Sequence, residues 1–524
     1  MAKKILIVHG YSDGSTSFTG LGDFLVASGV YEKEHVFYLD YSSMDDQATF
    51  RDFADKLDAD RKTRLGNERV DVACHSTGSL VVRAWLALHA QRTRRRQLPA
   101  DTPCPVERLL CFAPANFGSD LATLGQSFLA KFRTTFFNSH AHKQDFLESG
   151  KAVLQGLEPA SPFQWELSEY DLHGPDTYFN PTRPPHQQCF PFVLAAGEAY
   201  GGVEARLVKQ RGMLGTDGTV RIPGTSLNTR GCSLDFREEG AALVWWQSCK
   251  HTQIPFAVFA GFNHGSIIDP THEGFAGPDG PGTLAIEALT GVVDLGSYQA
   301  MVKRFDAASL ANHAKLPEER KAPYQQFFFK VRDDVDMIVE DFFIDFHVVN
   351  RDGSTHQDLT LFFDEHFAKA ITRHSTTGSH RVFLMNCGKL DEFHQRLKAA
   401  DAVLMLEITG TSPLPDVIYE KSSYPAFDPK RPLAPNEPML LFPNTTTMVD
   451  VVLNRMQTDN LLVVKDCQLV VVSALAMREA TEPTGRATLV SHEADWQKGY
   501  FDWDRRKNAA AGRLTPQDQR NVHA

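Results

Sequence analysis

Three residues that are well separated along the chain have the side chains that acyl transfer through a covalent intermediate requires. Ser76 lies within residues 74–78, which read Cys-His-Ser-Thr-Gly, and Asp217 and His264 follow it in the chain. A serine hydroxyl becomes a nucleophile when a base takes its proton, and an acid is needed to orient that base. The sequence therefore predicts a nucleophile, an acid and a base at Ser76, Asp217 and His264.

The setting of Ser76 favours this role. An apolar run at residues 70–73 precedes the motif, and an apolar helical pattern at residues 78–89 follows it. A strained turn between a strand and a helix presents a serine hydroxyl above the sheet, and small residues at its first and last positions let strand and helix approach closely. A solvent-facing turn serine is the alternative. The residue before it, His75, is expected to pack or hydrogen-bond rather than to catalyse.

Asp217 is the predicted acid because its carboxylate lies beside glycine in a tight loop, after a predicted strand and before a short apolar run. It lies beside glycines in residues 215–220, downstream of an apolar run at residues 190–196. Glu198 lies nearer the end of that run and is the alternative acid, although it is equally suited to hydrogen-bonding within its own loop. Both carboxylates follow a strand and lie between Ser76 and His264 in the chain, which is where the acid lies in enzymes whose nucleophile, acid and base follow one another in this order.

His264 is the predicted base because it directly follows the apolar run at residues 256–260. A base is expected just past a strand end, where it can reach the nucleophile from the same edge of the sheet. A metal site at His264, Asp269 and His272 is the alternative, but this spacing matches no standard ligand pattern. We therefore expect no metal ion and no other cofactor.

The negative charge that develops on the substrate oxygen needs hydrogen-bond donors. One is expected from the backbone N–H of Thr77, directly after the nucleophile, and a second from that of Tyr11. Tyr11 follows His9 and Gly10, where glycine permits a tight turn at the end of the first predicted strand. The alternative for this segment is an ordinary strand exit.

Strands and helices alternate in the first part of the chain, which indicates an α/β fold with a parallel sheet. The expected strands are residues 4–8, 36–41, 70–73, 109–113, 190–196 and 256–260. Together with the serine turn, this order predicts an α/β-hydrolase domain over residues 1–318. An insertion at about residues 117–187 is expected to be a lid over the site or helices packed against the domain.

After residue 318 the pattern changes to short apolar runs separated by turn residues, which favours a β-sandwich-like domain over residues 319–478. One of its expected strands is residues 359–363. From residue 479 the chain is polar and is expected to be an extended or partly disordered tail.

Composition limits the partners and the compartment. With 54 basic and 65 acidic side chains the net charge is −11, which argues against a nucleic acid held by a basic field. The 8 scattered cysteines favour free thiols over a disulfide framework. No apolar run suits a signal peptide or a membrane-spanning helix, so we expect a cytoplasmic protein or one that contacts membranes peripherally.

The three motifs together resemble the bacterial PlaB-type phospholipase A/lysophospholipase family. The resemblance lies in the His-Ser-Thr-Gly turn at residues 75–78, the Asp-Gly-x-Val segment at residues 217–220, and a histidine 264 − 217 = 47 residues after the aspartate. It also includes the layout, with an amino-terminal lipase domain and a β-rich domain after it. Cys74 departs from the threonine that members of this family often have there.

The resemblance implies deacylation of glycerophospholipids and lysophospholipids at a membrane surface, without a redox cofactor, and it implies self-association into a homo-oligomer. Two other functions remain open at this point. One is a soluble carboxylesterase or triacylglycerol lipase, since fold and triad fit many esters. The other is a lipid-binding or partner-binding module in which the hydrolase part is an inactive scaffold.

Overall fold

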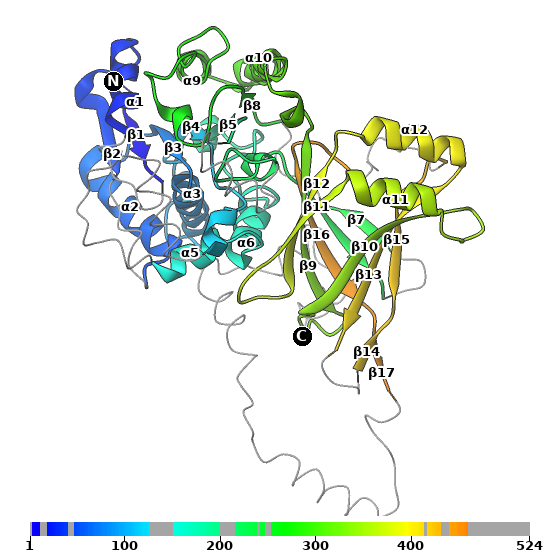
Figure 1. Ribbon diagram of the computed structural model, residues 1–524. Helices are drawn as coiled ribbons and strands as arrows, with labels where there is room; N and C mark the ends of the chain where they lie inside the picture. The colour runs from blue at the N-terminus through cyan, green and yellow to red at the C-terminus, as the bar shows by residue number, and fades with distance from the viewer. Residues whose placement is uncertain are drawn as a thin grey trace, which may run out of the picture.

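The structure is a computed structural model that describes most of the chain. The described residues are 3–10, 18–39, 47–124, 150–199, 215–237, 242–246, 253–412, 417–430 and 440–458. They form an α/β part and a β-rich part that lie side by side (Figure 1). Tyr11, residues 125–149 of the predicted insertion and the predicted tail at residues 479–524 lie outside the described residues.

A six-stranded sheet runs through the α/β part in the order β2-β1-β3-β4-β5-β8, and each neighbouring pair is parallel. The strands are β1 (Ile5–Val8), β2 (Val36–Leu39), β3 (Val70–His75), β4 (Val106–Phe112), β5 (Phe190–Ala196) and β8 (Phe256–Phe259). Parallel strands are covered on both faces, which explains why β1, β3 and β5 are apolar or buried along their whole length. Their carboxyl ends meet at one edge, where residues from distant segments gather.

Helices cover both faces of this sheet. The helices are α1 (Thr19–Ala27), α2 (Phe50–Leu65), α3 (Gly78–Arg94), α5 (Lys151–Leu157), α6 (Pro162–Asp171), α8 (Ile222–Thr225), α9 (Pro281–Gly291) and α10 (Leu295–His313). Short 3₁₀ helices span Lys33–His35, Asp120–Leu124, Pro185–Gln187, Ser266–Ile268 and Glu318–Arg320. Side chains alternate in direction along a strand, so Leu6 and Val8 pack in the core beneath α2, α3 and α6, whereas Ile5 and Ile7 pack beneath α1, α9 and α10.

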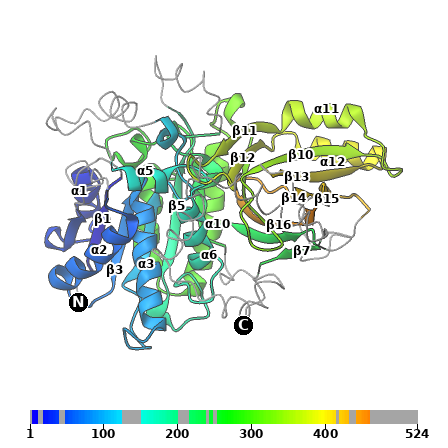
Figure 2. The same cartoon turned by 90° about the horizontal axis from the view of Figure 1, so that it is seen from below.

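Helix α6, in the predicted insertion, is held against α3 by a buried ion pair. The guanidinium of Arg83 donates from Nε and Nη2 to the two carboxylate oxygens of Asp171 at 2.8 and 2.9 Å. The two helices lie next to each other in the view from below (Figure 2). Helix α6 therefore packs as a core helix, and a lid in the insertion stays a prediction.

The β-rich part contains two stacked sheets and a small ribbon. A six-stranded sheet has the order β11-β12-β9-β16-β6-β7, a three-stranded sheet the order β10-β13-β15, and the ribbon joins β14 to β17. The strands are β6 (Arg230–Asp235), β7 (Ala242–Trp245), β9 (Tyr324–Asp333), β10 (Asp341–Val349), β11 (Ala368–Arg373), β12 (His380–Asn386), β13 (Val403–Thr411), β14 (Val417–Tyr419), β15 (Ser422–Phe427), β16 (Thr446–Leu453) and β17 (Arg455–Gln457). Apolar side chains from both sheets form one core.

Strand β9 of the larger sheet is buried on both faces, which joins the two parts of the molecule. Phe327 and Phe329 on β9 point into the core of the β-rich part, whereas Phe328 belongs to the core of the α/β part and contacts Trp165 edge-on at 5.1 Å. The sheet also includes β6 and β7, which come from the first part of the chain, and β6 pairs in parallel with β16. The sequence did not indicate this pairing, and the boundary between residues 318 and 319 stays a prediction.

The expected strand at residues 359–363 is wrong, because this segment lies in helix α11 (Gln357–His366). Leu359 and Phe363 are buried while Leu361 is 65% exposed, which is the spacing of a helix and not of a strand, where all three would share one face. A second helix, α12 (Leu390–Ala400), lies on the same side and was not predicted.

Two further findings concern covalent structure and membranes. The six cysteines in the described part of the chain are buried and free, as their scattered positions predict. None of the described helices combines the length and the apolar character needed to cross a bilayer.

Candidate active site

Ser76 occupies a strained turn between β3 and α3. Its φ angle is 52°, in the left-handed region, which costs a residue with a side chain about 1–2 kcal/mol. The main chain on both sides is tied to the end of β4, because the Ser76 N–H donates to the Phe112 carbonyl and the Ser76 carbonyl accepts from the Ala115 N–H, both at 3.1 Å. These bonds hold the strained conformation in place.

Two glycines allow the chain to pass close to Ser76. A Cβ atom added at Gly78 would lie 2.5 Å from the His9 carbonyl oxygen and 2.8 Å from that of Val8, so only glycine lets α3 begin this close to β1. A Cβ added at Gly10 would lie 3.0 Å from the Ser76 Cβ. The segment that leads to Tyr11 therefore runs directly beside Ser76, although Tyr11 itself lies outside the described residues.

Asp217 lies in a tight loop that orients its carboxylate. One oxygen, Oδ1, accepts the N–H groups of Thr219 and Val220 at 2.9 and 2.8 Å, and the Asp217 N–H donates to the Val220 carbonyl at 3.1 Å. Gly218 has a φ of 99°, which the turn requires. The buried carboxylate thus keeps its second oxygen, Oδ2, for another donor.

Side chains from three other segments hold this loop from outside. The Arg320 guanidinium donates to the Thr216 carbonyl at 2.9 Å, and the Ser119 hydroxyl donates to the Thr219 carbonyl at 2.6 Å. Arg221 pairs with Asp120 and also donates from Nη2 to the hydroxyl of Thr372, on strand β11 of the β-rich part, at 2.7 Å. Sequence reasoning missed these residues, because nothing in their local pattern indicates which loop they contact.

His264 follows β8 and contacts Asp217 in two ways. Its Nδ1–H donates to Oδ2 of Asp217 at 2.8 Å, and its main-chain N–H donates to the Asp217 carbonyl at 3.2 Å. The side chain is 3% exposed and that of Asp217 is 1% exposed. Because the Nδ1 hydrogen is donated to Asp217, the neutral imidazole carries its lone pair on Nε2, which is the tautomer that a general base needs.

The His75 side chain joins the nucleophile turn to the loop of His264. Its Nε2 lies 2.8 Å from the His264 carbonyl oxygen, and the two imidazole rings have centroids 4.7 Å apart. Burial, together with the neighbouring His264, lowers the pKa of His75 well below its usual range, so this imidazole is neutral. Its expected role as a packing or hydrogen-bonding residue agrees with these contacts.

The remaining predicted site residues are placed as follows. Thr77 immediately precedes α3 and is fully buried, next to Ser76. The Glu198 carboxylate accepts the Gly261 N–H at 2.7 Å, which is the loop-binding role given as its alternative. Within the described residues, no three histidine, cysteine, aspartate or glutamate side chains are arranged to hold a metal ion.

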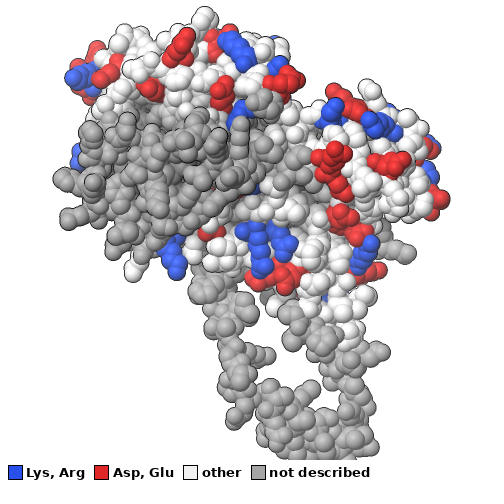
Figure 3. All heavy atoms as spheres, in the orientation of Figure 1, with Lys and Arg blue, Asp and Glu red and all other residues white. Residues whose placement is uncertain are grey.

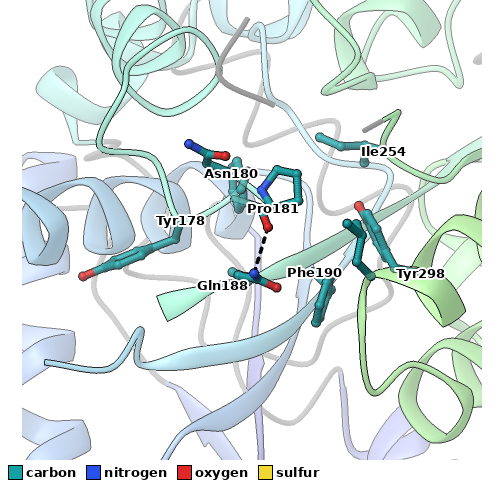
Figure 4. A pocket seen from close by; sticks show the side chains of 10 residues that line it. Tyr178, Asn180, Pro181, Gln188, Phe190, Ile254 and Tyr298 are labelled. Carbon is teal, nitrogen blue, oxygen red and sulfur yellow. Dashed lines mark hydrogen bonds between the residues drawn. The ribbon is translucent and has the colours of Figure 1, made fainter. Parts of the chain in front are cut away.

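A pocket with an open volume of about 270 Å³ lies elsewhere on the α/β part (Figure 4). It is lined by Tyr178, Phe179, Asn180, Pro181, Gln188, Cys189, Phe190, Ile254, Leu295 and Tyr298. Phe190 begins β5, whereas the predicted acid and base follow the carboxyl ends of strands. The pocket therefore lies away from Ser76 and is not part of the candidate site.

A parallel sheet with helices on both faces, and a strained serine turn between β3 and α3, define the α/β-hydrolase fold, to which further β-sheets are attached. The predicted fold class is confirmed. Solved structures of phospholipase PlaB from Legionella pneumophila share this fold. One aligns with a TM-score of 0.70 and 21% identity over 89% of this chain and 96% of PlaB. Another, of PlaB in complex with thio-NAD, aligns with a TM-score of 0.71 and 19% identity over the same shares.

At this level of identity the similarity establishes the fold, and the predicted resemblance is confirmed at that level. No family model matches the sequence, and no curated protein matches it.

Proposed function

We propose that the chain is a serine hydrolase that deacylates glycerophospholipids and lysophospholipids through an acyl-enzyme on Ser76. The observation that carries this proposal is the 2.8 Å hydrogen bond from His264 Nδ1 to Asp217 Oδ2, in a loop that His75 ties to the strained serine turn. A buried acid that fixes the tautomer of a histidine serves general-base catalysis. The shared fold with phospholipase PlaB supports a lipolytic hydrolase.

In the proposed mechanism the Ser76 oxygen attacks the acyl carbonyl while its proton passes to Nε2 of His264. Asp217 stabilises the imidazolium through the Nδ1 hydrogen bond, and the backbone N–H groups of Thr77 and Tyr11 bind the oxyanion. The imidazolium then protonates the departing alcohol, which leaves the acyl group on Ser76. Water, activated by the same histidine, releases the fatty acid and restores the serine.

The phospholipid substrate requires peripheral contact with a membrane. The proposal also includes self-association, because the family resemblance implies it. The charges visible on one face of the molecule are mixed, with acidic and basic side chains next to each other (Figure 3). On this face the described charges form no basic field, so we propose a neutral or apolar contact with lipid and no nucleic acid as a partner.

The test is a comparison of the wild-type protein with Ser76→Ala on a panel of esters. The panel contains phosphatidylcholine, phosphatidylglycerol, their lyso forms, triacylglycerol and short p-nitrophenyl esters. We expect the wild type to release fatty acid from the phospholipids and their lyso forms, and Ser76→Ala to lower this rate by about 10⁴ to 10⁶.

Three outcomes distinguish the functions. Fast turnover confined to triacylglycerol or p-nitrophenyl esters would replace the phospholipid substrate with that of a lipase or carboxylesterase. Unchanged lipid deacylation by a folded Ser76→Ala protein would remove Ser76 as the nucleophile. No labelling of the wild type by a fluorophosphonate probe, together with no turnover, would indicate a binding module.

A further inference from the structure

His264 is held by three hydrogen bonds, and the third does not come from the acid. Asp217 binds its ring through Nδ1 and its main-chain N–H, whereas the His264 carbonyl oxygen lies 2.8 Å from Nε2 of His75. The first two bonds orient the base relative to Asp217. They do not by themselves set its distance from Ser76, which lies on another loop.

His75 is suited to set that distance because it immediately precedes the nucleophile. Its backbone is the last residue of β3, and the next residue, Ser76, is fixed on both sides by its bonds to Phe112 and Ala115. The bond from His75 to the His264 carbonyl therefore joins a rigid turn directly to the loop of the base. Any movement of that loop away from Ser76 must break or bend this bond.

The protonation state of His75 agrees with this role. A carbonyl oxygen only accepts, so Nε2 of His75 carries the hydrogen and Nδ1 carries a lone pair. Nδ1 is buried and has no hydrogen-bond partner among the described residues. The imidazole is buried and neutral, so it adds no charge beside His264 when that residue takes up the serine proton, 4.7 Å away between ring centroids.

We propose that His75 is a positioning residue that fixes the separation between Ser76 and His264 by binding the main-chain carbonyl of the base. The inference rests on the proposed function, since it assigns Ser76 and His264 the roles of nucleophile and base. The proposed role depends on the hydrogen bond and not on packing. The His75 ring also contacts Phe18, with centroids 5.8 Å apart. A phenyl ring in place of the imidazole keeps this contact but has no hydrogen-bond donor.

The experiment compares His75→Phe, which keeps an aromatic ring but has no donor, with His75→Gln, whose amide can donate to the same carbonyl. His272→Phe is the control for loss of a histidine, because His272 follows His264 in the chain and its Nδ1 contacts the Glu273 carbonyl instead. For each full-length variant the active sites are titrated with a fluorophosphonate. The rate of labelling and kcat for a p-nitrophenyl ester are then expressed per active site, and Tm is measured.

We expect His75→Phe to lower the labelling rate and kcat per active site by about 10- to 100-fold, because a displacement of about 1 Å between reacting groups has an effect of this size. KM should change little. His75→Gln should remain within about 5-fold of the wild type, and His272→Phe within about 2-fold. A purely structural role would lower Tm or the number of titratable sites and leave the rate per site unchanged.

The inference is overturned if His75→Phe reacts at the wild-type rate per site, or if His75→Gln is as slow as His75→Phe. If His75→Phe does not fold, His75→Asn replaces it, since its shorter amide does not reach the carbonyl, and the comparison with His75→Gln is judged in the same way. Failure of the proposed function has a different signature. In that case the wild type itself is not labelled on Ser76, and both the function and the role of His75 are rejected.

Discussion

Asp217→Asn tests whether the hydrogen bond to His264 does more than hold the ring in place. In the structure, Oδ1 of Asp217 accepts two backbone N–H groups, so an asparagine there must keep its carbonyl oxygen on that side. Its NH₂ group then faces Nδ1 of His264 and can only donate to it. The imidazole must therefore place its hydrogen on Nε2, which leaves no lone pair to take the serine proton.

The expected cost follows from this change of tautomer. Geometry and packing are retained, so Tm should stay close to that of the wild type, while kcat falls by about 10⁴, equivalent to about 5 kcal/mol in the barrier. The assay is steady-state hydrolysis of a p-nitrophenyl ester, with Tm measured on the same samples. Glu198→Gln is the matched control, because its side chain contacts the Gly261 N–H and its amide oxygen can still accept. Retention of more than a tenth of kcat by a folded Asp217→Asn protein would refute the tautomer argument.

Three other predictions concern the scaffold. Gly78→Ala places a Cβ 2.5 Å from a main-chain carbonyl just past β1 and should cost about 1–3 kcal/mol in urea unfolding, whereas Gly291→Ala, with nothing within 4 Å, should not destabilise. Burial lowers the pKa of His89 from 6.5 to about 4, so the unfolded chain binds a proton first as pH falls. Between pH 6.5 and 5 the free energy of unfolding should therefore fall by about 2 kcal/mol because of this histidine. In His89→Gln the free energy of unfolding should depend less steeply on pH over this range. Arg83→Met leaves the buried carboxylate of Asp171 without its cation and should lower the free energy of unfolding by about 3–5 kcal/mol. The double variant Arg83→Met/Asp171→Leu removes both charges and should recover most of this loss, because a buried ion pair adds little net stability.

The positions of Ser76 and His264 were predictable because each follows a strongly patterned strand. The run before Ser76 is a fully buried strand, and in the run before His264 buried and partly buried residues alternate. The carboxyl ends of parallel strands meet at one edge whatever the intervening sequence contains. The choice of Asp217 over Glu198 depended on its glycine-flanked loop, and the structure places Asp217, not Glu198, within hydrogen-bond distance of His264. Their catalytic roles stay predictions.

What the sequence did not predict depends on distant contacts or on short patterns. The bond from His75 to the His264 carbonyl requires a side-chain direction that no local pattern specifies. Residues 359–363 form an apolar run of only a few residues, and a run this short fits a strand or one turn of an amphipathic helix equally well. The segment forms a helix because this places Phe363 against Phe367 and Phe393 in the core of the β-rich part.

The pairing of β6 with β16 also sets the order in which this protein can be completed during synthesis. Arg230 pairs with Thr447, so 447 − 230 = 217 further residues must be made after Arg230 before its partner is present. At ribosomal rates this takes about 10 to 40 s, during which the edge of β6 that faces β16 has no strand beside it. An unpaired edge can join another chain, so the nascent protein has a period in which aggregation competes with folding. We therefore expect chaperones to affect yield most strongly in this interval, and a chain truncated before residue 446 to aggregate even though its complete α/β sheet is present.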